Sequence, residues 1–250
     1  MDHRTGLLSV LVNAYAAFGT GGQDISGTSW IMQYNPKTRK VLYKTNITEI
    51  SQGRYGGPQD VEQDPHGNTY IVGTFSSSIM KIDKRGKAEE WYLKKPINTT
   101  QWGYSGIAAK NWTLLASDEE TGGLFRFDMR KEKGIPIPIP LNPDHKLGKC
   151  DAAYLPRRYN GTVLLVAEMF VGISVYQDKK GKWESASYKG TVPWTGDPTM
   201  QVTASVQIGE SIYMSAEGFL DPLAPGEVSG NRTDFYFPDI TQEVDALVAA

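Results

Sequence analysis

The sequence predicts an all-β fold built from repeated, four-stranded antiparallel sheets. At four places a short strand ends in an aromatic or apolar residue followed by a polar one, namely Asn35, Asp83, Asp128 and Gln177. These positions lie 48, 45 and 49 residues apart. A repeat of about 40 to 50 residues made of short strands and turns is typical of a β-propeller blade. We therefore expect a β-propeller of the six-bladed type, with five blades visible in the chain.

Length and composition fit one propeller domain over residues 1–250. Hydrophobic residues make up 40% of the chain and charged residues 22%, which are ordinary values for a globular protein that buries one substantial core. The net charge of −2, without a long basic run, argues against a nucleic-acid partner. No apolar stretch reaches the roughly 18 residues of a membrane span. The oligomeric state is left open.

The first blade is expected to be incomplete. Residues 7–13, 29–34 and 41–45 have the pattern of a second, third and outer strand, but no inner strand precedes Leu7. Open sheet edges invite unwanted pairing, so a propeller needs to close its ring. The sequence thus suggests a longer protein whose N-terminal part, with any signal peptide, is missing. A five-bladed ring closed by the C-terminal tail is the alternative.

The other blades follow in order. The second is expected at residues 60–63, 70–75, 79–83 and 89–93, and the third at 106–109, 114–117, 124–128 and 135–140. The last of these segments alternates Ile and Pro, and because proline cannot donate to a β-ladder it belongs in an edge strand. The fourth blade is expected at 152–155, 163–167, 173–177 and 183–188. The fifth is expected at 202–207 and 212–215, with 234–237 as a third strand after a long loop.

Asparagine usage suggests a glycoprotein of the secretory route. Five of the nine asparagines begin an Asn-x-Thr sequon, and they are Asn46, Asn98, Asn111, Asn160 and Asn231. The alternative is that Asn-x-Thr simply suits turns and strand ends, in a cytoplasmic protein. The single cysteine, Cys150, excludes a disulfide within the chain and is expected to be a buried apolar residue.

One segment carries a family resemblance. Residues 57–72, GPQDVEQDPHGNTYIV, resemble the blade motif of SMP-30/NHL-like six-bladed propellers, although Pro58-Gln59-Asp60 departs from the Pro-Asp-Gly of that motif. With its sequons and aromatic loops, the chain more specifically resembles fungal secondary-metabolite propellers, the group of the trichothecene-cluster propeller protein and the hetero-Diels–Alderases. The resemblance implies either a cyclase that needs no cofactor or a hydrolase that uses a divalent cation.

Aligning the blades brings polar residues to two equivalent positions, where loops of one face converge on the channel. The inner-strand position is occupied by Asp60, Gly106, Asp151 and Thr203, and the position after the second strand by Thr74, Asp118, Glu168 and Glu217. Carboxylates gathered in a channel raise one another's pKa or recruit a cation. The alternative is that each carboxylate caps a turn or accepts a neighbouring backbone N–H.

Two sets of site residues follow from this alignment. For a cyclase we expect Gln59, Tyr104, Asp151 and Gln201 to stabilise developing charge, and Tyr55, Asp60, Phe75, Trp102, Glu168, Phe170, Thr203 and Phe219 to hold an apolar substrate. For a hydrolase like SMP-30 we expect Asp60, Asp118, Asp151, Glu168 and Glu217 to hold a divalent cation such as calcium.

Other routes to catalysis have little support in the sequence. No histidine is placed as a general base, and His66 is expected on the face opposite the site. The leading hypothesis is therefore an enzyme that guides cyclisation or (hetero-)Diels–Alder cycloaddition of an apolar, reactive intermediate. The alternatives are the metal-dependent hydrolase or lactonase and a secreted propeller that binds without catalysis, since propellers host all three.

Overall fold

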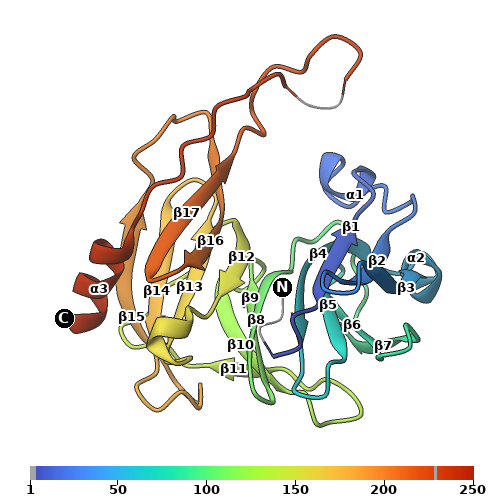
Figure 1. Ribbon diagram of the computed structural model, residues 1–250, viewed down its shortest axis with the longest axis horizontal. Coiled ribbons are helices and arrows are strands. Elements are labelled where there is room, and N and C mark those ends of the chain that lie inside the picture. The colour runs from blue at the N-terminus through green and yellow to red at the C-terminus, as the bar shows by residue number, and fades with distance from the viewer. Residues whose placement is uncertain (1–3, 228–229) are drawn as a thin grey trace. The chain divides into compact units, whose positions relative to one another are not determined.

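A computed structural model describes residues 4–227 and 230–250 of the chain (Figure 1). It divides into two compact units, Met1–Pro138 and Ile139–Ala250, which are described separately here. Within the described residues the strands form five antiparallel sheets. Neighbouring strands in each sheet are consecutive in sequence, which is the meander expected of a propeller blade.

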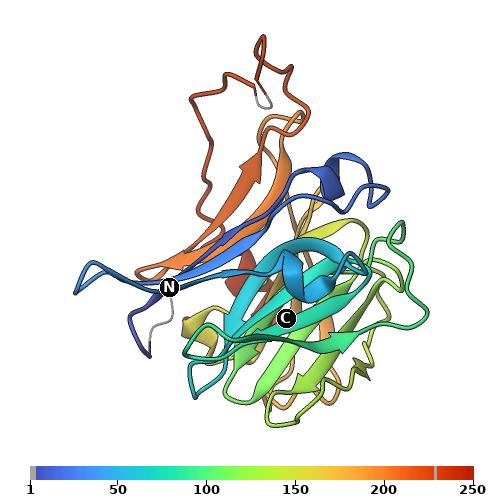
Figure 2. The same cartoon turned by 90° about the vertical axis from the view of Figure 1, so that its right-hand side faces the viewer.

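Unit 1 contains the first three sheets. Figure 2 looks at this unit with the second sheet toward the viewer. The first sheet comprises β1 (Leu8–Val12), β2 (Trp30–Asn35) and β3 (Lys40–Asn46), and the second β4 (Gly56–Gln63), β5 (Thr69–Phe75), β6 (Ser78–Ile82) and β7 (Ala88–Leu93). The third comprises β8 (Tyr104–Lys110), β9 (Thr113–Asp118), β10 (Gly123–Asp128) and β11 (Ile137–Ile139), with the proline-containing β11 at its edge as predicted. Two short helices, α1 (Ala16–Gly19) and α2 (Thr48–Ser51), lie in the connections.

Unit 2 contains the fourth and fifth sheets. The fourth comprises β12 (Cys150–Tyr154), β13 (Val163–Glu168), β14 (Gly172–Gln177) and β15 (Ser187–Pro193). A 3₁₀ turn, η1 (Arg157–Tyr159), lies in the connection from β12 to β13. The fifth is a pair, β16 (Gln201–Ile208) and β17 (Ser211–Glu217), and α3 (Thr241–Ala249) follows it. Apolar side chains of β13, β14 and β16 form one buried core with Val244 of α3.

The recurring polar residue at the strand ends has a local cause. Asn35, Asp83 and Asp128 each end or follow the next-to-last strand of a sheet, and a side-chain oxygen of each accepts the backbone N–H two residues later at 2.8–3.0 Å. Such a contact tightens the hairpin to the last strand of the sheet. In the fourth sheet Asp178 makes this bond, at 2.9 Å, and not the predicted Gln177.

Three predictions about elements are wrong. The outer strand of the fourth sheet is β15, because Trp183 is completely buried at φ +56° with its indole N–H bonded to the Gly161 carbonyl. Residues 234–237 form no strand; Pro238, which has no N–H to donate, accepts from Met214 N–H just beyond them. Helix α3 was not expected, and it forms because Val244 and Leu247 recur on one face and reach the core of unit 2.

Every complete first strand carries one extra residue. At one place in each of β4, β8, β12 and β16, the strand uses one residue more than the neighbouring strand that pairs with it. This extra residue lies between Pro58 and Val61, between Tyr104 and Ile107, between Cys150 and Ala153, and between Val202 and Ala204. This is the geometry of a β-bulge, which commonly re-aims side chains beside functional sites. The bulges enclose Asp60, Gly106, Asp151 and Thr203, so the four inner-strand positions aligned from the sequence are structurally equivalent.

Candidate functional site

In unit 1, Asp60 links two neighbouring sheets at the bulge of β4. Its Oδ2 accepts the backbone N–H of Ile107 on β8 at 3.0 Å, and its Oδ1 accepts that of Val61 at 2.8 Å. Ile107 lies where the bulge of β8 interrupts its pairing with β9. The adjacent Gln59 accepts a hydrogen bond from the Thr74 hydroxyl at 2.9 Å. Both predicted positions of this sheet therefore meet at one end of β4 and β5.

Glu62 is a site residue that the sequence analysis missed. Its carboxyl group accepts the backbone N–H groups of Gln63 and Ala109. Each of these lies two residues after an N–H that Asp60 accepts. Part of its surface reaches solvent, yet the carboxyl group lies deep among protein atoms. Burial, followed by the charge of Asp60, raises the pKa of Glu62 to about 8. A carboxyl group on the first strand is therefore held neutral near pH 7.

The aromatic residues predicted in unit 1 fall into two groups. Phe75 and Trp102 pack edge to face with ring centroids 4.9 Å apart, and Phe18 completes the cluster. Tyr55 and Tyr104 are both buried in apolar cores. The hydroxyl of Tyr104 donates to Tyr92, and burial raises the pKa of Tyr104 far above its ordinary value. These two tyrosines are thus walls of the core.

Asp118 occupies the predicted position after the second strand of the third sheet. It is almost fully buried and accepts hydrogen bonds from the Thr121 hydroxyl at 2.8 Å and from the Glu120 N–H. Burial raises the pKa of Asp118 above its ordinary value, while the Thr121 hydrogen bond opposes that shift. This carboxyl group therefore closes the turn that follows β9.

In unit 2, Glu168 is the centre of a buried polar network. It lies at the end of β13 and is only 4% exposed. One oxygen accepts the Gly148 N–H at 2.9 Å, and the other accepts the Ser174 hydroxyl. Ser174 in turn meets the Thr191 hydroxyl at 2.7 Å. The carboxylate is thus placed by three elements and has a donor at each oxygen.

His145 belongs to the same network, although the sequence analysis expected no histidine to be placed as a general base. Its Nε2 is 3.9 Å from Glu168 Oε1, and its Nδ1 lies 2.8 Å from the Tyr176 hydroxyl. The imidazole stacks on Tyr188 with centroids 3.8 Å apart. Burial and the nearby charge of Glu168 raise the pKa of Tyr176. No sequence pattern indicates this histidine, because it lies in the irregular segment before β12, outside the blade repeat.

The remaining predicted residues of unit 2 lie at the same end of its sheets. Asp151 is half-buried in the bulge of β12 and Thr203 in that of β16. Gln201 begins β16 opposite Glu217 and is 1% exposed. Its Nε2 donates to the Thr199 carbonyl at 2.9 Å, whereas its Oε1 is buried and receives no hydrogen bond from the described residues.

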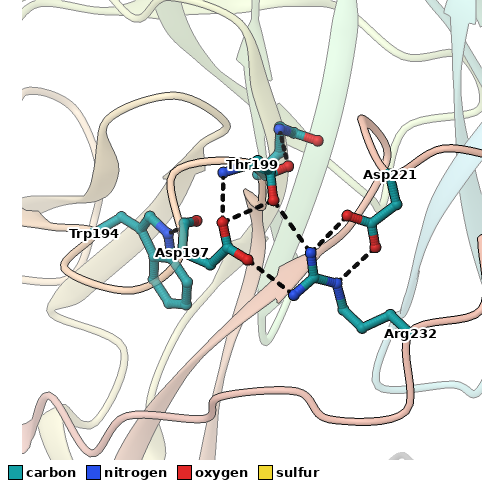
Figure 3. A network of polar contacts seen from close by, with 6 residues as sticks. Trp194, Asp197, Thr199, Asp221 and Arg232 are labelled. Carbon is teal, nitrogen blue, oxygen red and sulfur yellow. Dashed lines mark hydrogen bonds and ion pairs between the residues drawn. The ribbon is translucent and has the colours of Figure 1, made fainter.

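A cationic clasp joins two loops at this end (Figure 3). Arg232 donates twice to Asp221, at 2.6 Å each, and also to Asp197 at 3.0 Å and to the Thr199 hydroxyl at 3.1 Å. Trp194 lies beside the clasp, with its indole N–H bonded to the Asp197 carbonyl at 2.9 Å. The guanidinium therefore fixes the segment after β17 onto the loop between β15 and β16.

Apolar side chains project from the turns around this end. Phe170 follows Glu168 in the turn after β13 and is 64% exposed, and Phe219 follows β17 and is 62% exposed. Met169 accepts the Val202 N–H at 2.9 Å, which brings the turn after β13 beside the start of β16. Others at this end are Val171, Leu220 and Leu223. Large exposed apolar residues gathered over one end mark an interaction site for an apolar partner or ligand.

The carboxylates do not assemble a metal centre within either unit. Among the described residues no group of three or more His, Cys, Asp or Glu side chains has the geometry to hold a metal ion. Asp60, Asp118 and Glu168 already accept protein hydrogen bonds. The donor sets of the separate units therefore do not fit the calcium-like site of the hydrolase alternative. In the part of the chain that the structure describes, no helix is both long and apolar enough for a membrane span.

Solved structures with the same fold confirm the predicted β-propeller class. A luciferin-regenerating enzyme superposes with a TM-score of 0.50 and 14% identity, over 86% of this chain and 81% of that protein. The structure of streptogramin B lyase gives a TM-score of 0.50 and 11% identity, over 93% of this chain and 73% of that protein. At these identities the likeness concerns the fold, and the six-bladed count stays a prediction.

Sequence relatives are closer. No protein-family profile matches the chain. Trichothecene biosynthesis protein 14 of Trichoderma arundinaceum is 32% identical over 250 residues, covering 97% of this chain and 68% of that protein. Core trichothecene cluster protein 14 of Fusarium sporotrichioides is 32% identical over 248 residues, covering 96% of this chain and 65% of the relative. The chain thus spans about two thirds of the length of these relatives, and it belongs to the family of trichothecene cluster protein 14.

Proposed function

We propose that this chain is part of an enzyme of fungal-type secondary metabolism that guides cyclisation or (hetero-)Diels–Alder cycloaddition of an apolar intermediate. Its relatives are named for trichothecene biosynthesis, which supports a role in secondary metabolism. The observation that carries the finer proposal is the exposed Phe170 and Phe219 beside the buried, half-satisfied Gln201. Apolar walls with a few polar groups are what such a substrate requires.

A cyclisation needs little covalent help from the protein. Holding two reacting ends in a near-attack arrangement supplies about 7–11 kcal/mol at best. The unpartnered Gln201 Oε1 is a natural acceptor for a substrate hydroxyl. Asp151, in the neighbouring bulge, is the proposed group that stabilises charge developing on a carbonyl or quinone-methide oxygen. Glu168 is proposed to position neighbouring groups and not to contact the substrate, since its two oxygens already accept hydrogen bonds from Gly148 and Ser174.

The test compares product profiles of a host carrying the biosynthetic genes with and without this chain. We expect the chain to raise the yield of one cyclised stereoisomer, and Phe170→Ala to lower stereoselectivity about 5- to 30-fold through loss of a cavity wall worth ~1–2 kcal/mol. Asp151→Asn is expected to lower turnover more than binding. His66→Ala is the control. His66 lies in the turn between β4 and β5, at the end of these strands opposite Gln59 and Thr74, and its ring packs against Trp112.

Each alternative function predicts a different result. Identical products and stereoisomer ratios with and without the chain would refute the cyclase proposal. Hydrolysis of an added lactone that stops with a chelator would support the metal-dependent hydrolase instead. Tight binding of an apolar metabolite without turnover would support a binding propeller.

A further inference from the structure

The five sequons differ in how the folded chain presents them. Asn98, Asn111, Asn160 and Asn231 are exposed, whereas Asn46 is half-buried at the end of β3. All five end in threonine, and none has proline at the middle position. A mature N-linked glycan must remain in solvent, so exposure of the asparagine in the folded state decides which sequons tolerate one.

Asn46 is engaged by its surroundings. Its Nδ2 donates to Glu49 Oε1 at 2.9 Å, and its Oδ1 accepts the Thr48 N–H at 3.1 Å. The Thr48 hydroxyl donates to the Gly27 carbonyl at 3.0 Å and accepts the Ser29 N–H at 2.8 Å. Both polar residues of this sequon therefore have a structural role, and a sugar on Nδ2 would displace the Glu49 contact.

Asn98 and Asn231 offer their amide nitrogens to solvent. Asn98 uses only its Oδ1, which accepts both the N–H and the hydroxyl of Thr100 at 3.1 and 2.9 Å. The side chains of Asn231 and Thr233 form no hydrogen bond with the residues that the structure describes, so no internal contact explains this sequon. Arg232, between them, anchors the backbone through the clasp and leaves its neighbours exposed.

Asn111 and Asn160 occupy left-handed turns, at φ +53° and +50°. Asparagine tolerates this conformation well, so the backbone alone accounts for its presence there. Both turns leave the side chain exposed, one between β8 and β9 and the other just before β13. Within its own unit, Asn111 lies at the end of β8 and β9 opposite Asp118, and Asn160 lies at the end of β12 and β13 opposite Glu168.

We propose that Asn98, Asn111, Asn160 and Asn231 are N-glycan acceptors and that Asn46 is not. In the transfer, the Asn Nδ2 attacks C1 of an oligosaccharide carried on a polyprenyl diphosphate. The N–C1 bond forms, the C1–O bond to the diphosphate breaks, and Nδ2 loses one proton to the transferase. The proposal places this chain in the secretory route. It does not depend on the proposed cyclase activity, because acceptor sites are measured without any substrate of the enzyme.

The experiment expresses the full 250-residue chain behind a secretion signal in yeast. The secreted protein is treated with peptide N-glycosidase in ¹⁸O-water, which converts each glycosylated Asn to a labelled Asp that peptide mass spectrometry counts. We expect label at the four exposed sequons at several-fold higher occupancy than at Asn46. Absence of label at all four, or label at Asn46 equal to that at Asn98, would overturn the proposal.

Thr233→Ala is a variant that we expect to fold normally, because the Thr233 side chain is exposed and makes no described hydrogen bond. It removes the sequon and keeps Asn231, so the label at Asn231 is expected to disappear while the other sites keep theirs. Thr233→Ser, which restores the sequon, is expected to restore the label. Label that persists in Thr233→Ala would show that the signal at Asn231 does not come from the sequon.

Discussion

Asp60 and Glu62 stand two residues apart on β4, and each accepts a backbone N–H from β8. Their proximity has opposite consequences for the two acids. Asp60 accepts two N–H groups at near-ideal distances, whereas Glu62 is mostly protonated at neutral pH because its carboxyl group is buried and because a second charge beside Asp60 is unfavourable. Glu62 therefore adds little negative charge to this pair at neutral pH.

This arrangement predicts how stability depends on pH. The pKa of Glu62 is about 8 in the folded chain against an ordinary 4.5, so between these values the unfolded chain binds fewer protons and stability falls as pH rises. Glu62→Gln removes this dependence, and we expect it to be about 1–3 kcal/mol more stable than the wild type at pH 9, with little difference at pH 4. Urea unfolding at both pH values measures it. Glu89→Gln, at an exposed position of β7, is the control; equal pH dependence of Glu62→Gln and wild type would contradict the assignment.

At the scale of elements, the loops of unit 2 are ordered by one side chain. Arg232 is the shared donor to Asp197 and Asp221. The hydrogen bonds from Thr199, followed by the one from Arg232, hold the pKa of Asp197 below its ordinary value, and the Arg232 hydrogen bonds do the same for Asp221. Lowered acid pKa values stabilise the clasp at neutral pH, and this contribution is lost as the pH falls through them. Lysine cannot reproduce the two-pronged contact with Asp221.

We therefore expect Arg232→Lys to accelerate amide hydrogen exchange in the loops 194–199 and 218–227 by about tenfold, as loss of ~1–1.5 kcal/mol of local stability would. The midpoint of global unfolding is expected to change little, because the loops lie outside the core of unit 2. Arg130→Lys is the matched control: Arg130 also contacts an aspartate, Asp128, but on an exposed turn. Unchanged exchange in both loops would show that the clasp does not order them.

The sequence predicted the repeated elements well and the irregular ones poorly. Strand positions followed from alternating apolar residues and from Asn or Asp at the hairpins, because both are local properties. The bulged positions Asp60 and Asp151 could be aligned because the repeat fixes them. His145 contacts Glu168, 23 residues away in sequence, and Arg232 contacts Asp197, 35 residues away, so no local sequence pattern predicts either contact. Likewise the exposed segment 234–237 has strand-like composition but no partner strand.

At the scale of the whole molecule, the family assignment and the carboxylate contacts bear on the metal question. A bound cation at one hundred times its Kd would add ~2.7 kcal/mol of stability, or about 5–10 °C in the unfolding midpoint of a chain of this size. Because Asp60, Asp118 and Glu168 are already hydrogen-bonded, we expect the midpoint to stay within about 1 °C between excess calcium and excess chelator. Scanning calorimetry of the intact chain measures this. A rise of several degrees with calcium would revive the hydrolase alternative.

The bulge shared by the first strands also has a meaning for how this family diversifies. Each of the second to fifth sheets has one extra residue at the same place in its first strand, and strand pairing continues normally on either side of it. The occupant of that place is therefore separable from the architecture: aspartate in two sheets, glycine and threonine in the others. Substitutions at these four bulge positions would change the side chains that contact a ligand and leave the strands unchanged. Related chains can therefore diverge in substrate before they diverge in fold.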